Sequence, residues 1–179
     1  KCLDALTTGN FNTAVGYGSA GALTTGASNT AVGYLALSTT ESATGNTAVG
    51  MNALAANTTG DKSVAIGGNA LLVNTTGSNN VAIGFEAMDA NTDGDYNTAI
   101  GYVVMSANTT GDHNTAVGRG SLGTNITGDS NTAIGRDALK ASTGSYNTAV
   151  GKDSLEENTT GANNVAVGYQ ALDANTTAS

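Results

Sequence analysis

Apolar and polar positions follow one another along this chain in a unit close to N-T-A-V-G-x-x-A-L-x-x-N-T-T-G-x-x. The glycine that closes the first five residues of the unit recurs in steps of 17 residues, apart from one step of 16. These glycines are Gly16, Gly33, Gly50, Gly67, Gly84, Gly101, Gly118, Gly135, Gly151 and Gly168. So short and regular a period is the sequence signature of a repeat architecture. We therefore expect a single elongated domain of ten coils over residues 12–179, cut from a longer array, with residues 1–11 as the tail of a preceding repeat.

Each unit contains one stretch that favours a strand and one segment that favours a turn. Thr, Val and Ile follow the first asparagine, whereas N-T-T-G marks a reversal of the chain. A pair of packed helices does not fit into 17 residues, but one turn of a solenoid does. We predict an all-β fold, a parallel β-solenoid or β-roll with one coil per repeat. With strands about 4.8 Å apart, its coils would form a rod of roughly 50 Å.

Both faces of the predicted strand are apolar. The fourth residue of the unit is Val or Ile in every copy, and the third is always alanine. These two positions point to opposite faces, because side chains alternate across a strand. We expect Val or Ile to fill the inside of the coil together with the Leu of the "AL" pair.

The alanine face would then need a cover, and a neighbouring subunit is the simplest one, because small side chains let backbones approach closely. We therefore predict a homo-oligomer, whose three-fold symmetry rests on the resemblance described below. The predicted interface residues are Ala14, Ala31, Ala48, Ala65, Ala82, Ala99, Ala116, Ala133, Ala149 and Ala166.

The asparagine and the glycine of the unit have structural interpretations. Asparagine begins nine of the ten copies, and Ser63 replaces it in the other. Stacked in register, these amides would form a ladder that satisfies backbone groups. The glycine is expected at the corner after the strand, in a backbone conformation that other residues avoid.

Two stretches resemble a known family. "SVAIGGNAL" from Ser63 and "NVAIGFEAM" from Asn80 are similar to the S/N-V-A-I-G-x-x-A motif of YadA-like heads in trimeric autotransporter adhesins. The unit from "NTAVGYGSA" to "NTTG" resembles the repeat arrays of bacteriophage tail-fibre proteins and related bacterial fibres. The resemblance implies a left-handed coil, a homotrimer and an extracellular place, on a virion tail fibre or a bacterial cell surface. The period departs from the adhesin pattern by about three residues per coil, in the N-T-T-G turn.

The position after each corner glycine varies, and it carries aromatic residues in half of the copies. These candidate ligand-stripe residues are Tyr17, Tyr34, Phe85, Tyr102 and Tyr169. They could stack on sugars, whereas packing between subunits is the favoured alternative. Three successive copies place Arg119, Arg136 and Lys152 there instead. Because Asp137 and Asp153 sit beside two of these cations, we expect a solvated ladder of charges.

Composition narrows the classes of function. The net charge is −8, and no basic stripe runs along the chain, which argues against nucleic acid as a partner. No stretch is long enough to span a membrane. His113 is the single histidine and has no acid–base partner, and the acidic turn at Asp93 and Asp95 offers too few oxygens for calcium. We expect no catalytic residues, no metal site, no cofactor and no enzymatic activity.

Three classes of function stay open. The first is a structural segment of an extracellular fibre or end-to-end filament, with copies of the chain as partners. The second is an adhesin module that binds a cell-surface glycan or receptor. The third is ice binding, which regular rows of threonine can support, but here the threonines considered lie in turns and vary between copies.

Overall fold

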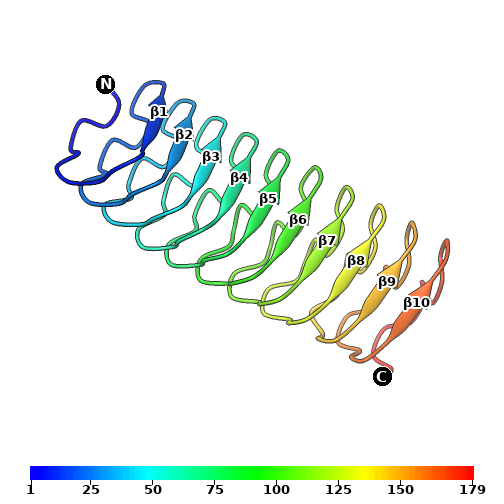
Figure 1. Ribbon diagram of the computed structural model, residues 1–179. Helices are drawn as coiled ribbons and strands as arrows, with labels where there is room; N and C mark the ends of the chain where they lie inside the picture. The colour runs from blue at the N-terminus through cyan, green and yellow to red at the C-terminus, as the bar shows by residue number, and fades with distance from the viewer.

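The computed structural model describes all residues from Lys1 to Ser179. The chain winds into a rod with ten short parallel strands stacked along it (Figure 1). The strands are β1 (Thr13–Val15), β2 (Thr30–Val32), β3 (Thr47–Val49), β4 (Val64–Ile66), β5 (Val81–Ile83), β6 (Thr98–Ile100), β7 (Thr115–Val117), β8 (Thr132–Ile134), β9 (Thr148–Val150) and β10 (Val165–Val167). They form a single sheet in which each strand pairs with the next one along the chain. The predicted β-solenoid with one coil per repeat is therefore confirmed.

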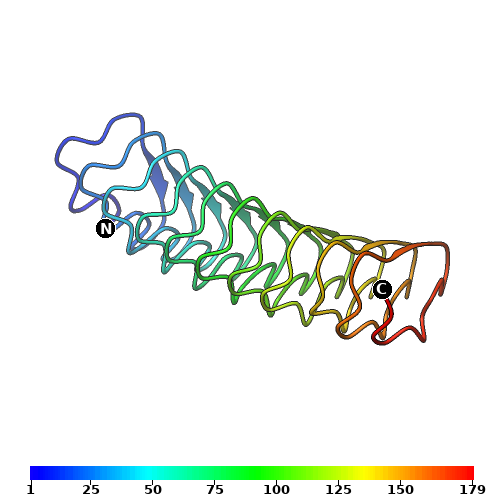
Figure 2. The same ribbon diagram turned by 90° about the horizontal axis from the view of Figure 1, so that it is seen from below.

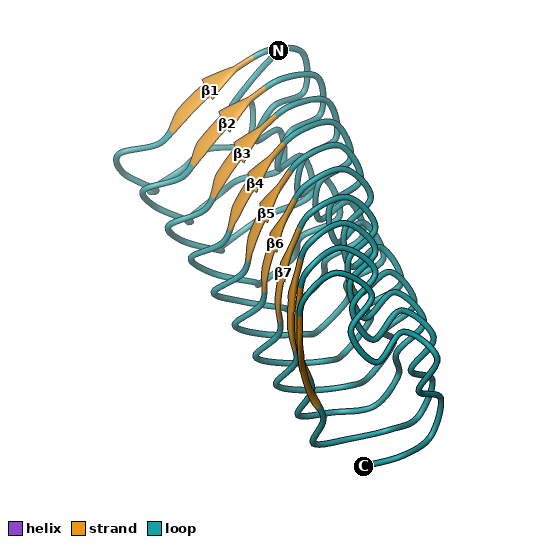
Figure 3. Cartoon of the chain, turned by 90° about the vertical axis from the view of Figure 1, so that its right-hand side faces the viewer, coloured by secondary structure: helices purple, strands orange, loops and turns teal.

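Equivalent residues of successive coils lie directly beside each other. In β5 and β6, for example, Ala82 pairs with Ala99 and Ile83 with Ile100. The turns stack in the same way. Of the 109 backbone hydrogen bonds, 91 lie outside the regular strands, and most of these join adjacent coils, such as the bond from the N–H of Thr75 to the carbonyl oxygen of Thr92. The strands thus occupy one side of the rod, and stacked loops form the other sides (Figures 2 and 3). Backbone hydrogen bonding continues around the coil although each strand has only three residues.

The core is a thin column of alanine and leucine. The central alanine of each strand points inward and meets residues from the segment after the corner glycine, such as Ala87 and Met88 in the coil of β5. Leucine or methionine occupies the second of these positions in nearly every coil, for example Leu54 and Leu71. The interior is narrow. The strand alanines and the small residues such as Ala87 form two columns of small side chains, which leave room for one column of Leu or Met.

This arrangement reverses the predicted facing of the strand. Ala82 and Ala99 are fully buried within their own chain, whereas Ile100 is 37% exposed. The prediction that alanine faces a neighbouring subunit and that Val or Ile fills the coil is therefore wrong. Only one large side chain per coil fits opposite the strand, and the Leu column already supplies it. The alanines assigned to a subunit interface are instead core residues at Ala31, Ala48, Ala65, Ala82, Ala99, Ala116, Ala133, Ala149 and Ala166, with Ala14 partly buried at the edge of the core.

The corner glycines take backbone angles that favour glycine, with φ between +123° and +144°. A Cβ atom on Gly33 would overlap the carbonyl oxygen of Gly50 in the next coil, so close stacking of coils also requires glycine at this corner. Other residues of each coil are left-handed without being glycine, such as Asn52 and Leu54 at φ +57° and +51°. This conformation is costly for most residues, and the stacked hydrogen bonds of the solenoid hold it in place.

Candidate functional site

A regular surface feature is the outside of the sheet, which we call the outer strand face. Its two columns are formed by the first and third residues of every strand. The first column consists of Thr13, Thr30, Thr47, Val64, Val81, Thr98, Thr115, Thr132, Thr148 and Val165. The second consists of Val15, Val32, Val49, Ile66, Ile83, Ile100, Val117, Ile134, Val150 and Val167.

The outer strand face contains no charged residue, and most of its side chains are β-branched and apolar. All of its residues are half-buried or exposed in the single chain. Ten strands about 4.8 Å apart, each roughly 10 Å long, give it a projected area of roughly 450 Å². The largest apolar patch of a soluble monomer commonly covers about 300–600 Å² and is often functional, so the outer strand face, with its continuous Val/Ile column, has the size of a candidate interaction surface.

A ladder of asparagine side chains supports the start of each strand. The backbone N–H of Asn97 donates to Oδ1 of Asn80 at 2.8 Å, and Nδ2 of Asn80 donates to the carbonyl oxygen of Gly94 at 2.7 Å. The same pair of bonds recurs at Asn114 in the coil of β7. The predicted amide ladder is therefore confirmed, and it fixes the position of the outer strand face.

The candidate ligand-stripe residues lie just beyond the corner glycines, beside the outer strand face. Tyr17 stacks on Tyr34 with ring centroids 5.7 Å apart, and Phe85 stacks on Tyr102 at 5.8 Å. Tyr169 lies under the ammonium group of Lys152, whose Nζ is 4.9 Å from the ring centroid. All five aromatic rings are exposed. They form two stacked pairs and one separate ring rather than a continuous stripe.

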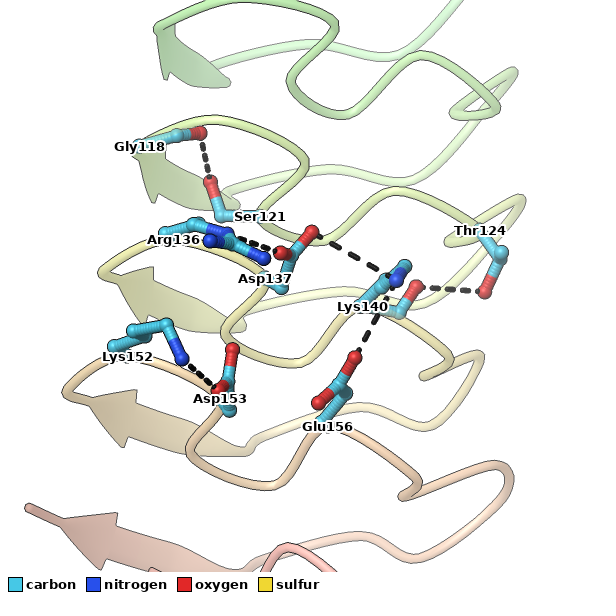
Figure 4. A network of polar contacts seen from close by, with 9 residues as sticks. All are labelled: Gly118, Ser121, Thr124, Arg136, Asp137, Lys140, Lys152, Asp153 and Glu156. Atoms are coloured by element: carbon cyan, nitrogen blue, oxygen red, sulfur yellow. Dashed lines mark hydrogen bonds and ion pairs between the residues drawn. The ribbon is translucent and has the colours of Figure 1, made fainter. Parts of the chain in front are cut away.

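The cations of the same column meet carboxylates, as predicted for two of them (Figure 4). Nε of Arg136 lies 2.8 Å from Oδ2 of Asp137, and Lys152 pairs with Asp153. The hydrogen bond from each cation to its aspartate raises the pKa of Arg136 and of Lys152. Arg119 forms no ion pair.

Two open grooves interrupt the loop side of the rod, and the sequence analysis did not identify them. The larger has a volume of about 480 Å³ and crosses three coils around Gly120 and Gly123. The smaller, of about 340 Å³, lies around Gly18 and Gly21. In both coils glycine occupies the second and the fifth position after the corner glycine, where most other copies carry side chains. Comparing these two positions between copies would have revealed the grooves.

The structure contains no group of three or more His, Cys, Asp or Glu side chains that could hold a metal ion. The imidazole of His113 stacks on the ring of Tyr96, with centroids 5.0 Å apart. No helix of the chain has the length and apolar character needed to cross a bilayer. Comparisons with models of protein families, with curated proteins and with solved structures give no significant match to this chain.

Proposed function

We propose that this chain is a structural segment of an extracellular fibre, which supplies length and stiffness and associates with copies of itself. The observation that carries the proposal is the outer strand face, which is uncharged, consists of Val, Ile and Thr side chains only, and is continuous over ten coils. A second copy of the chain has a complementary surface of the same kind and length. Association would remove the apolar columns of both copies from water, which is the main source of free energy in such interfaces.

Three copies around one axis are the arrangement that we propose. The resemblance of the repeat to YadA-like heads and to phage tail-fibre arrays supports this number. It also supports an extracellular place, on a virion tail fibre or a bacterial cell surface. The narrow coil independently supports association between copies, because a core with one column of large side chains buries little apolar surface within a single chain, and side-by-side contact would add to it.

Measurement of molar mass by light scattering, together with small-angle X-ray scattering, tests the proposal. We expect the wild-type protein to have three times the 17.5 kDa mass of one chain and an elongated shape. In the double variant Ile66→Lys and Ile100→Lys, the mass should fall to that of one chain, because two charges would be buried in the interface. The matched control is Thr59→Lys, which adds a charge at an exposed turn away from the strands.

Circular dichroism separates assembly from folding in this experiment. Ile66 and Ile100 point out of the coil, so the double variant should keep the spectrum of the wild-type protein. A wild-type protein that stays monomeric at all concentrations, or a double variant that keeps the wild-type mass, would contradict the proposal.

A second candidate function is binding of a cell-surface glycan or receptor on such a fibre. The observation that favours it is the set of exposed aromatic rings beside the outer strand face. The same rings could pack between subunits. Measuring the molar mass and the glycan binding of the Tyr34→Ala variant separates the two roles. Loss of mass in this variant would assign the ring to the interface, whereas unchanged mass with lost glycan binding would assign it to a ligand.

A further inference from the structure

The larger groove is built by a local change in the repeat. Gly120 occupies a position where the adjacent coils carry Val103 and Asp137, and all three residues are left-handed, with φ between +50° and +67°. Val103 and Asp137 hold this conformation despite its cost, so the fold of the coil does not require glycine at position 120. Its effect is to leave out a side chain, and Gly123 does the same three residues later. The result is a hollow one coil wide, with side chains of the two adjacent coils as its walls.

The groove is electropositive although the chain as a whole has a net charge of −8. Arg119, Arg136 and Lys140 line it, and Asp137 is the single carboxylate among its lining residues. Asp137 does not present its charge to the groove, because its side chain is only 8% exposed and pairs with both Arg136 and Lys140. Lys140 also reaches Oε1 of Glu156 at 3.3 Å (Figure 4).

Arg119 is the cation that these carboxylates leave free. It lies on the wall of the groove, is exposed, and forms no ion pair or side-chain hydrogen bond within the chain. A guanidinium group presents a planar set of N–H donors that matches the two oxygens of a carboxylate or sulfate. The lining therefore offers an unused site for an anionic group.

An aromatic ring completes the lining. Tyr102 is 54% exposed, borders the groove, and is held in place by stacking on Phe85 at an angle of 14°. A small inorganic anion would use only the cations. An aromatic ring beside an unpaired guanidinium and an open hollow of about 480 Å³ suits a larger ligand that joins a flat apolar surface to a negative charge.

We propose that the groove between Tyr102 and Arg119 binds an acidic saccharide, a sugar ring that carries a carboxylate or a sulfate. The ring packs against Tyr102 over the space left by Gly120 and Gly123, and the anionic group accepts hydrogen bonds from Arg119. The groove extends away from the strands towards Thr124 and Lys140, so copies associated through the outer strand face leave this end accessible (Figure 4). This inference deepens the second candidate function and does not require a trimer.

Isothermal titration of the full chain with four probes tests the proposal. The probes are sialyllactose for the carboxylate, a heparin tetrasaccharide for the sulfate, lactose as the neutral sugar, and sodium sulfate as the anion without a ring. We expect saturable binding of at least one acidic sugar, weaker binding as salt is added, and no saturable binding of lactose or sodium sulfate. Arg119→Gln should weaken the binding at least about tenfold, because it removes a charge-assisted hydrogen bond.

Three further variants distinguish this site from a general attraction of anions. Gly120→Asn fills the groove with a residue that the same position carries at Asn52 and Asn69. Its Cβ would lie 2.6 Å from Oδ1 of Asp137, so this side chain must move aside, and binding should weaken at unchanged charge. Tyr102→Ala should also weaken binding, and its matched control is Tyr146→Ala, which removes an exposed ring outside the groove and should leave binding unchanged. Failure of both acidic sugars to bind, equal binding of sodium sulfate, or binding unaffected by Arg119→Gln would overturn the proposal. The molar mass of each variant, measured in parallel, keeps this outcome separate from that of the fibre proposal.

Discussion

Gly84 lies directly against the carbonyl oxygen of Gly101 in the next coil, where a Cβ atom on Gly84 would overlap that oxygen. Its φ of +137° also lies outside the range of other residues. We predict that Gly84→Ala lowers the free energy of unfolding by at least about 3 kcal/mol, because backbone strain and a clash with backbone act together. Urea denaturation followed by circular dichroism measures the change.

Gly68 provides the control for this substitution. It is the residue after a corner glycine, its φ is not positive, and an added Cβ would only contact the ring of Phe85 at 3.4 Å. Gly68→Ala should therefore change stability by less than about 0.5 kcal/mol. Equal effects of the two substitutions would show that the corner does not require glycine.

The inward facing of alanine can be tested at Ala99, which is fully buried. We predict that Ala99→Leu lowers the free energy of unfolding by about 1–3 kcal/mol, because the extra methyl groups overfill a narrow core. Thr98→Val changes the neighbouring outward position to the residue found at Val81 and should be nearly neutral. Thermal denaturation of the two variants distinguishes the inward from the outward face. A stable Ala99→Leu protein that no longer assembles would instead support the prediction that the alanines face a neighbouring subunit.

The amide ladder is expected to be essential at Asn80. Alanine there would leave the N–H of Asn97 without its partner and remove one of the two hydrogen bonds that the carbonyl oxygen of Gly94 accepts, the other coming from Nδ2 of Asn91. The expected cost is about 1–3 kcal/mol. Serine should cost less, because Oγ of Ser63 already accepts the N–H of Asn80 at 3.2 Å in the neighbouring coil. Hydrogen exchange of the Asn97 amide compares Asn80→Ala with Asn80→Ser, and similar exchange in both variants would contradict this role.

Asp89 should destabilise the coil at neutral pH. Its Oδ1 atom is buried without a hydrogen-bond partner, and burial, with a smaller contribution from Glu86, raises the pKa of this carboxyl above 3.8. A raised pKa in the folded state means that ionised Asp89 opposes folding above that pKa. We predict that Asp89→Asn increases the free energy of unfolding by about 1 kcal/mol at pH 7.

The pH dependence gives the control for this prediction. As the pH falls through the raised pKa of Asp89, the carboxyl becomes protonated in the folded protein, and the advantage of Asp89→Asn should shrink and disappear below about pH 3.8. Denaturation at a series of pH values measures the difference. A difference that is independent of pH would assign the effect to packing rather than to the charge.

The period of the sequence was sufficient to predict the solenoid and the place of its corners. It was not sufficient to decide which face of the strand is inside, because alternation shows which residues share a face but not which way that face points. Ala82 and Ile83 are both apolar, so polarity gave no distinction between them. The decision depends on the volume available opposite the strand, where the column of Leu71 and Met88 already fills the core.

The candidate site was less accessible to prediction from sequence. The aromatic and cationic residues after the corner glycines were identified, but their grouping into stacked pairs and ion pairs depends on side-chain conformations. The groove depends on two missing side chains, at Gly120 and Gly123, in a chain with 25 glycines. Only alignment of each copy on the others separates these two from the glycines that the backbone requires.

The continuous stacking of hydrogen bonds around the coil has a mechanical consequence. Each coil is held mainly by its two neighbours, so a rod pulled from its ends would release coils one at a time, beginning with a terminal coil that has a neighbour on one side only. Each release would free 17 residues and lengthen the chain by roughly 50 Å, about ten times the height of the coil in the rod. The same repeat that gives a stiff rod at low force would thus give an extensible tether at high force.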